Sequence, residues 1–268
     1  MLFRVPELPE VETVRRQLDR RLPGRRIRSA QSHPSANFAQ ATEAIGSRVE
    51  TVGRRGKFLL IGLDDDREMV IHLGMTGVLR PTSPDTTTDP YVRARWLFDS
   101  GDGLELRDVR RFGRVSVLAR GHYSGILAKL GPEPFGDDFT PRSLYAALAR
   151  SRRPIKTQLL SQLPVAGVGN IYADEALWLA GINPARRSLG PTRAGRLHDA
   201  LVEVLESGIA HGGTTLRDYR TVDGTQGGHQ HHLACYGRAG LPCDRCGSIL
   251  RRMVLDGRST TYCASCQH

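Results

Sequence analysis

The sequence predicts a multidomain α+β protein, and three observations lead to this fold class. Short apolar or alternating runs, punctuated by Gly, Pro and Asp, follow one another from Arg25 to about Gly121. Stretches with helical periodicity replace them beyond residue 130. Four cysteines in two Cys-x2-Cys pairs lie at the end of the chain. We therefore expect a strand-rich part, a helical part and a small metal-bound part, in this order.

The composition favours a nucleic-acid-binding protein over a membrane protein. The 268 residues carry a net charge of +10, with arginines along the whole length. A protein this basic usually meets a polyanion, although a basic surface that contacts only solvent is the alternative. No stretch approaches the roughly 20 apolar residues of a membrane span, and "MLFRV" does not begin a signal peptide. We expect a soluble, cytoplasmic protein.

The first predicted element is a helix that follows the motif "PELPE" at residues 6–10. Pro9 suits its first turn, Glu10 suits a helix N-terminus, and Pro23–Gly24 is expected to end it. Pro6 and Glu7 therefore lie just before the helix. Its apolar face repeats at helical spacing: Val11, Val14, Leu18 and Leu22.

Strands come next, and helices follow them. "RRGKFLLIGL", "EMVIHLGMTGVLR", "RARWLF", "GLELRDV" and "GRVSVLA" predict strands without intervening helices, which indicates a sandwich or a barrel. Residues 130–141 are typical of a linker. Beyond it, "PRSLYAALAR", "IKTQLLSQL", "IYADEALWLAGI" and "AGRLHDALVEVLESGIAHGG" carry helical apolar stripes. The polar, glycine-rich residues 223–232 predict an exposed loop.

The terminal cysteines predict one structural zinc ion. Sixteen residues separate "CDRC" from "CASC", a spacing typical of a tetrahedral zinc ribbon. Two disulfides are the alternative, disfavoured because no secretion signal is present. We expect Cys235 to be a small buried residue, and the histidines of "GGHQHHL" to be solvated, although they could bind metal. The predicted zinc ligands are Cys243, Cys246, Cys263 and Cys266.

Several motifs occur in an order that points to one family. They are "PELPEVETVRRQL", "GKFLLI", "HLGMTG", "DVRRFGR", "LGPEP", "IKTQLLSQLPVAGVGNIYADEALWLAGINP", "GGTTLRDY" and "YGRAGLPCDRCG". In this order the chain resembles the bacterial formamidopyrimidine-DNA glycosylase (Fpg/Nei) family from Pro6 to Gln267. The resemblance implies an N-terminal β-sandwich with flanking helices (6–130), a helix–two-turns–helix domain (131–225) and a zinc ribbon (233–268).

The resemblance also implies a chemistry. Such enzymes remove an oxidised purine from duplex DNA and then nick the strand by β,δ-elimination. Pro6 matches the N-terminal proline whose secondary amine forms a Schiff base with C1′. Glu7 matches the neighbouring acid, which burial can keep protonated. Lys57 and Arg258 match the residues assigned to β-elimination and δ-elimination, and both are expected to contact phosphate.

Further residues match the family's contacts with DNA. Met75, Arg110 and Phe112 match the three residues that fill the space left by the extruded nucleotide. Lys156 and Asn170 match contacts with the phosphate backbone, and Gly167 and Gly169 are expected to let the chain approach DNA closely. Tyr91 and Arg93 align weakly with further phosphate contacts.

The sequence departs from the family at four places, one of them the stretch "DPYVRARW", where the family often has histidines near phosphate. Family members begin Met-Pro-Glu, whereas "MLFRV" precedes Pro6 here, and an amide nitrogen cannot form an iminium. We interpret Val5 as the initiator, encoded by GTG, so that the mature chain begins at Pro6. The lesion-binding loop has Gly228–His229 in place of the usual aromatic sequence, which leaves lesion preference open. Ser161 stands where Asp is common.

We therefore predict a bifunctional glycosylase and AP lyase acting on oxidised purines such as 8-oxoguanine and formamidopyrimidines. Its expected partner is damaged double-stranded DNA, and its expected state is a monomer associated with the bacterial nucleoid. The endonuclease VIII branch, which acts on oxidised pyrimidines, is the alternative enzyme. A lesion-binding protein without catalysis would result if "MLFRV" were retained. A zinc-ribbon transcription factor would leave "PELPE" unexplained.

Overall fold

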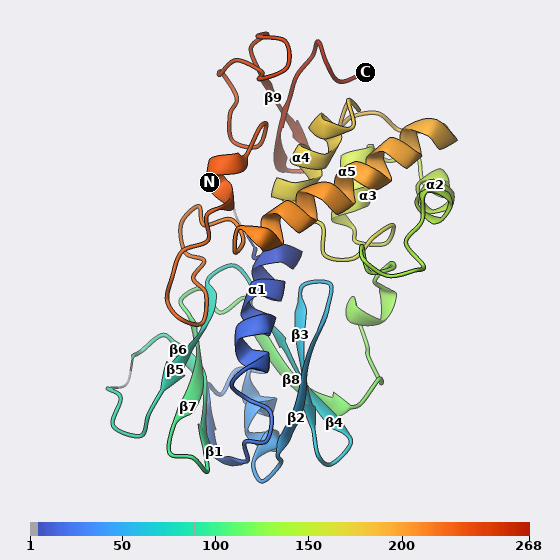
Figure 1. Cartoon of the computed structure of the whole chain (residues 1–268). Coiled ribbons are helices and arrows are strands. Elements are labelled where there is room, and N and C mark those ends of the chain that lie inside the picture. Colours follow the sequence, from blue (N-terminus) through green and yellow to red (C-terminus); the bar gives the residue numbers. More distant parts are fainter. Residues whose placement is uncertain (1–4, 88) are drawn as a thin grey trace.

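The computed structural model describes residues 5–87 and 89–268 as a β-sandwich joined to a group of helices and a terminal β-hairpin (Figure 1). The α-helices are α1 (Leu8–Asp19), α2 (Pro141–Ala149), α3 (Ile155–Leu160), α4 (Asn170–Leu179) and α5 (Pro191–Ala210). Short 3-10 helices are η1 (Ala39–Ala44), η2 (Leu127–Lys129) and η3 (His229–His232). The strands are β1 (Ile27–Ser32), β2 (Val49–Arg55), β3 (Phe58–Leu63), β4 (Arg67–His72), β5 (Gly77–Thr82), β6 (Val92–Phe98), β7 (Gly103–Asp108), β8 (Arg114–Ala119), β9 (Arg251–Leu255) and β10 (Arg258–Tyr262).

Two antiparallel sheets form the sandwich. One has the strand order β1-β6-β7-β5 and the other β2-β3-β4-β8. Their buried apolar side chains, among them Trp96, Leu106, Ile61 and Ile71, belong to one core. The prediction of a strand-rich N-terminal part is confirmed, and the choice between sandwich and barrel is resolved in favour of the sandwich.

Helix α1 belongs to both halves of the molecule. Val11, Val14 and Leu18 are buried in the sandwich core, whereas Leu8 at its first turn is buried in the core of the helical part. The helix ends at Asp19, earlier than the predicted stop at Pro23–Gly24, because residues 20–24 form turns that lead into the sandwich. The residues just before α1 therefore lie where the two halves meet (Figure 1).

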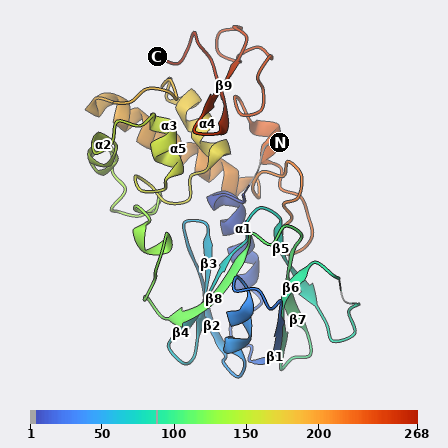
Figure 2. The same cartoon turned by 180° about the vertical axis from the view of Figure 1, so that it is seen from behind.

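The helical part packs around α5, which contacts α1, α2 and α4. The chain after α5 turns back beside α1 (Figure 2), and Tyr219 and Val222 of this segment enter the sandwich core. Among the described residues, no helix combines the length and the apolar character needed to cross a membrane.

Two neighbouring acids of α4 hold the C-terminal part of the chain: Asp174 binds the hairpin of β9 and β10, and Glu175 binds the segment that precedes it. Asp174 accepts a hydrogen bond from the Thr261 backbone N–H (2.9 Å). The carboxylate of Glu175 accepts bonds from three successive backbone N–H groups at residues 234–236. Both acids are buried, so the hairpin has a defined position relative to the N-terminus of α4.

Candidate active site

Glu7 connects the first turns of two helices. It is the N-cap of α1, and its carboxylate accepts hydrogen bonds from the backbone N–H groups of Gly169 (2.7 Å) and Ile171 (2.9 Å) at the start of α4. Only 3% of Glu7 is exposed. Because the free N–H groups of a helix terminus attract negative charge, this arrangement fixes the carboxyl group beside Pro6.

Two glycines make this contact possible. A Cβ atom on Gly169 would lie 2.3 Å from the Glu7 carboxyl carbon. Gly167 has φ +83°, and a Cβ atom there would lie 2.6 Å from the Leu8 Cβ. The sequence led us to expect that these glycines admit DNA. In the structure they allow the loop before α4 to approach the start of α1, and the close approach to DNA stays a prediction.

Glu10 is a second buried carboxyl group, whose position the sequence did not reveal. It accepts hydrogen bonds from the Glu7 backbone N–H (2.8 Å), the Tyr172 hydroxyl (2.8 Å) and the Thr214 backbone N–H (2.6 Å). Burial, with the neighbouring charge of Glu7, raises the pKa of Glu10 to about 7. The Glu-x-x-Glu spacing of "PELPE" signals a capping box, but not the contact with Thr214, which lies far away in sequence.

The structure brings Glu7, Lys57 and Arg258 into one electrostatic environment. Burial raises the pKa of Glu7, opposed by the positive charge of Lys57 and by the backbone N–H groups of α4. Burial lowers the pKa of Lys57; Glu7 and Glu10 oppose this shift, and Arg258 adds to it. Lys57 lies in the turn between β2 and β3, and Arg258 begins β10. Burial thus favours the neutral form of both the Glu7 carboxyl group and the Lys57 amine.

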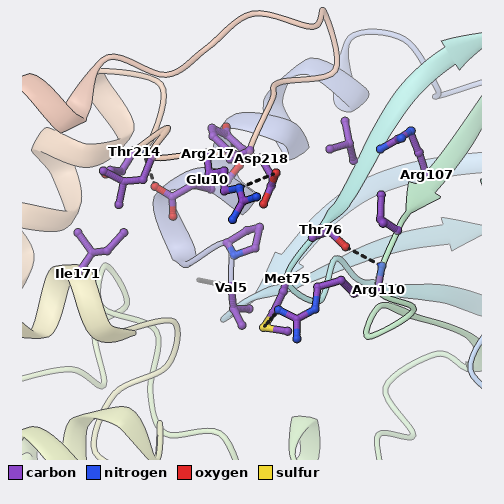
Figure 3. Close-up of a pocket in the computed structure, with 15 residues that line it drawn as sticks. Val5, Glu10, Met75, Thr76, Arg107, Arg110, Ile171, Thr214, Arg217 and Asp218 are labelled. Atoms are coloured by element: carbon purple, nitrogen blue, oxygen red, sulfur yellow. Dashed lines mark hydrogen bonds and ion pairs between the residues drawn. The ribbon is translucent and has the colours of Figure 1, made fainter. Parts of the chain in front are cut away.

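A pocket of about 640 Å³ opens beside Pro6 (Figure 3). Figure 3 shows Met75 and Arg110 together on one side of it, and Glu10, Arg217 and Asp218 on another. Such a volume accommodates a ligand of nucleotide size. Glu10 faces this space, whereas Glu7, Lys57 and Arg258 are not among its lining residues. These are Val5, Pro6, Glu10, Met75, Thr76, Val78, Arg107, Val109, Arg110, Ile171, Thr214, Leu216, Arg217, Asp218 and Tyr219.

Met75, Arg110 and Phe112 come together from two loops, and we call them the wedge group. The Arg110 Nη1 atom lies 3.9 Å from the Met75 sulfur, and its guanidinium carbon lies 4.9 Å from the centre of the Phe112 ring. Phe112 is 54% exposed. A large aromatic ring held in the open beside a cation is suited to contact a flat apolar partner such as a base.

Lys156 does not have the environment expected of a phosphate contact. Its side chain is fully buried and lies 2.6 Å from Asp174 Oδ1. The ammonium also donates to the Ser259 carbonyl (3.1 Å) and to the Thr260 hydroxyl (2.8 Å). Every contact is internal, so the structure corrects the expected direct DNA contact: Lys156 joins α3, α4 and β10.

Asn170, Tyr91 and Arg93 have different surroundings. Half-buried Asn170 donates to the Ser259 carbonyl (3.1 Å), which places it beside the same hairpin. Tyr91 is 42% exposed, with the Arg107 guanidinium carbon 5.0 Å from its ring centre. Arg93 is only 7% exposed, and it donates to the carbonyl groups of Asp108 (2.8 Å) and Pro90 (3.1 Å). The expected phosphate contact by Arg93 is therefore corrected to an internal one.

The four terminal cysteines form one metal-binding cluster. Their sulfur atoms all lie within 4.8 Å of one another, and Cys246 Sγ is 3.6 Å from Cys263 Sγ. A tetrahedral zinc ion with Zn–S distances of about 2.3 Å requires neighbouring sulfurs about 3.8 Å apart. The cluster fits a single zinc ion. The indole N–H of Trp178 donates to Cys243 Sγ (3.4 Å), an outer contact that orients this ligand.

Cys235 is buried as the sequence predicted, whereas His229 of the histidine-rich segment is not solvated as predicted. Cys235 is buried, as expected, outside the four-cysteine cluster, and burial raises the pKa of its thiol. His229 was expected to be solvated, but it is 3% exposed, with its ring centre 5.5 Å from that of Tyr172. It packs between the first turn of α4 and the base of the loop after α5, where the sequence predicted only a polar loop.

Three family models match the chain in succession. The N-terminal domain of formamidopyrimidine-DNA glycosylase matches residues 5–115, and the H2TH domain of formamidopyrimidine-DNA glycosylase matches residues 130–220. A zinc finger found in FPG and IleRS matches residues 240–268.

Relatives are similar over nearly the full length. The formamidopyrimidine-DNA glycosylase of Herpetosiphon aurantiacus is 44% identical over 275 residues, covering 98% of this chain and all of the relative. The crystal structure of the MutM (Fpg) protein from Thermus thermophilus has 45% identity and a TM-score of 0.90, with 98% of each chain covered. Lactococcus lactis Fpg in complex with DNA containing an abasic site has 35% identity and a TM-score of 0.89, covering 98% of this chain and 99% of the other.

Proposed function

Because this chain belongs to the formamidopyrimidine-DNA glycosylase family, we propose that it excises oxidised purines from duplex DNA through a covalent bond to Pro6. It is a DNA glycosylase of base-excision repair. 8-Oxoguanine and formamidopyrimidines are the proposed substrates. The observation that carries the proposal is the buried carboxyl group of Glu7, held by the first turn of α4 directly beside Pro6.

The first steps use Pro6 and Glu7. The Pro6 nitrogen attacks C1′ of the extruded nucleotide, and the bond from C1′ to the base breaks. Two leaving atoms, the sugar ring oxygen and the base, each take up a proton: one comes from Glu7, and the other is the proton that the Pro6 nitrogen loses as the iminium forms. Opening of the sugar ring leaves an iminium between Pro6 and C1′. Since the pKa of Glu7 is raised by burial, its neutral form is available for this proton transfer.

Lys57 and Arg258 serve the later steps. Loss of a proton from C2′ expels the 3′ phosphate, and a second elimination expels the 5′ phosphate. We assign Lys57 to the first elimination, because burial lowers the pKa of its amine. We assign Arg258 to the second and to the phosphates that flank the lesion, because it is exposed at the turn of the β9–β10 hairpin. Water then hydrolyses the iminium and releases Pro6.

The contact with duplex DNA is assigned to groups that are exposed or half-buried. The wedge group fills the space left by the extruded nucleotide, and Asn170 and Tyr91 contact the backbone. Lys156 supports Asn170 and the hairpin from inside, and Arg93 supports the wedge group. One structural zinc ion, held by Cys243, Cys246, Cys263 and Cys266, stabilises the hairpin that carries Arg258.

The proposed organisation comprises domains at residues 6–130, 131–225 and 233–268, acting as a monomer. The family models, matched to residues 5–115, 130–220 and 240–268, support this division. We place the protein in the bacterial cytoplasm, with the nucleoid, because its partner is DNA.

To act as a nucleophile, Pro6 must have a free amine. In the chain that begins at Met1, its nitrogen is an amide with Val5, which has no basic lone pair. We therefore propose that the active form begins at Pro6. Residues 1–4 lie outside the described residues, so the structure describes only Val5 of the segment that precedes Pro6.

The test is base release under single-turnover conditions by the chain that begins at Pro6. Duplexes would carry 8-oxoguanine, a formamidopyrimidine, an oxidised pyrimidine or no lesion. We expect the two purine lesions to be released fastest. Faster release of the oxidised pyrimidine would indicate an enzyme of the endonuclease VIII branch. Binding to every lesion without release of any base would indicate a lesion-binding relative.

A further inference from the structure

The wedge group depends on two loops that have little structure of their own. Met75 lies in the connection from β4 to β5, and Arg110 and Phe112 lie in the connection from β7 to β8. The loops touch closely, because a Cβ atom on Gly74 would lie 2.4 Å from the Gly113 nitrogen. The tip of the β7–β8 loop is exposed and Met75 is half-buried, and groups that fix the two loops lie beneath them.

Asp108 is the buried residue beneath both loops. Its side chain has no exposed surface, and each oxygen binds a different loop. One oxygen accepts a hydrogen bond from the Thr76 hydroxyl, beside Met75. The other accepts from the Gly113 backbone N–H (2.7 Å), beside Phe112.

Thr76 extends this connection to the third member of the wedge group. Its hydroxyl oxygen accepts a hydrogen bond from the Arg110 backbone N–H (3.1 Å) while its proton goes to Asp108. One carboxylate thus fixes the backbone next to Met75, Arg110 and Phe112 at once.

The sheet holds Asp108 itself in place. Asp108 is the last residue of β7, in register with Gly77 at the start of β5. Its backbone N–H donates to the Tyr91 carbonyl (2.9 Å), and its carbonyl accepts from Arg93 Nε (2.8 Å). Strand β7 therefore fixes the position of the Asp108 carboxylate, and the hydrogen bond from buried Arg93 helps to hold it there.

We propose that Asp108 is a positioning residue that holds the wedge group ready to enter the base stack when the damaged nucleotide leaves it. The proposal rests on the proposed function. Extrusion of a paired base costs free energy, and side chains that fill the vacancy recover this cost only if they are already in position. A misplaced wedge group would slow extrusion and leave the chemistry at Pro6 intact.

The experiment compares Asp108→Asn with Thr76→Val in the chain that begins at Pro6. In Asp108→Asn, the amide can accept only one of the two bonds. Thr76→Val keeps the side-chain shape and removes the hydroxyl, so it tests the connection even if Asp108→Asn does not fold. Glu105→Gln is the matched control. Glu105 is equally buried on β7, but it binds Arg80 and Arg95 of the neighbouring strands.

Single-turnover excision of 8-oxoguanine would be measured opposite cytosine and opposite a tetrahydrofuran residue, which presents no base to unpair. We expect both variants to be slowed about tenfold or more opposite cytosine and less than about threefold opposite tetrahydrofuran. Glu105→Gln should change the two rates by the same factor. Equal slowing on both duplexes, or no slowing, would overturn the proposal. Failure of the unsubstituted chain on both duplexes would instead contradict the proposed function.

Discussion

At the scale of single residues, Glu7 combines a structural and a chemical task. Its carboxyl group caps α1 and receives the N–H groups at the start of α4, yet the proposed reaction needs its proton. The helix N-terminus favours the ionised form, whereas burial favours the neutral form, and the pKa of Glu7 is raised because burial dominates. This balance shifts Glu7 toward its neutral form, while the N–H groups of α4 keep its carboxyl group in a fixed position.

Replacing Glu7 tests this assignment. We expect Glu7→Gln to slow base excision by about 100-fold or more, the usual contribution of a general acid, and to leave binding to abasic DNA within about threefold. Single-turnover excision and equilibrium binding measure the two effects. The exposed Glu43→Gln is the control. Unchanged excision by Glu7→Gln would refute the role of Glu7 as the acid.

Glu10 makes stability depend on pH. Its pKa is about 7 in the folded protein against an ordinary value of 4.5, so between these values the folded state binds more protons than the unfolded state. Stability should therefore fall as pH rises from about 4.5 to about 7. We expect Glu10→Gln to flatten part of this slope, measured by urea unfolding at several pH values. An unchanged slope would show that Glu10 titrates normally.

At the scale of elements, the contact between α1 and α4 depends on glycine. Gly169 and Gly190 precede α4 and α5 in extended conformations, but only Gly169 faces a neighbouring side chain. We expect Gly169→Ala to displace the Glu7 carboxyl group, lower stability by about 1–3 kcal/mol and greatly reduce excision. Gly190→Ala, which has open space around it, should leave both unchanged. Thermal unfolding and single-turnover excision would check this, and full activity of Gly169→Ala would contradict the geometry.

The hairpin of β9 and β10 should depend on zinc. Cys243→Ser removes a ligand, so we expect loss of bound zinc and at least about tenfold weaker binding to abasic DNA, because Arg258 loses its support. Metal analysis and binding titrations measure both quantities. Cys235→Ser is the matched control, because Cys235 is a buried cysteine outside the cluster and should retain one zinc ion per chain. Undiminished binding after verified zinc loss would contradict the role of the hairpin.

The elements were largely predictable from sequence, because their patterns are local. The helix after "PELPE", the strands of the sandwich and the four-cysteine cluster each follow from a short stretch of chain. The contacts between elements were not. The burial of Lys156 against Asp174, and the approach of Gly169 to Glu7, join distant segments whose side chains give no sign of their neighbours.

At the scale of the whole molecule, the net charge predicted the class of partner but not the residues that contact it. Several arginines are committed to internal ion pairs, as Arg54 is to Glu12 and Glu133, and Arg95 is to Glu105. A charge of +10 therefore does not identify the DNA-contacting face. We propose that the pocket marks this face, because it lies where α1 passes from the sandwich core into the helical core.

This junction explains why the start of the chain matters to the whole protein. Pro6 lines the pocket, and Val5 lies in it as well (Figure 3). Val5 occupies part of that space, and a residue bonded to the Pro6 nitrogen converts it into an amide. The central claim is therefore that activity requires Pro6 to be the first residue.

Borohydride trapping on a duplex containing 8-oxoguanine tests this claim most directly. Two forms would be compared, one beginning at Met1 and one at Pro6, each verified by intact mass. Reduction converts the iminium into a stable cross-link, so we expect a trapped complex only with the form that begins at Pro6. Equal trapping of the form that retains Met1–Val5, or excision by the Pro6 form without any trapped complex, would contradict the assignment of Pro6 as the nucleophile.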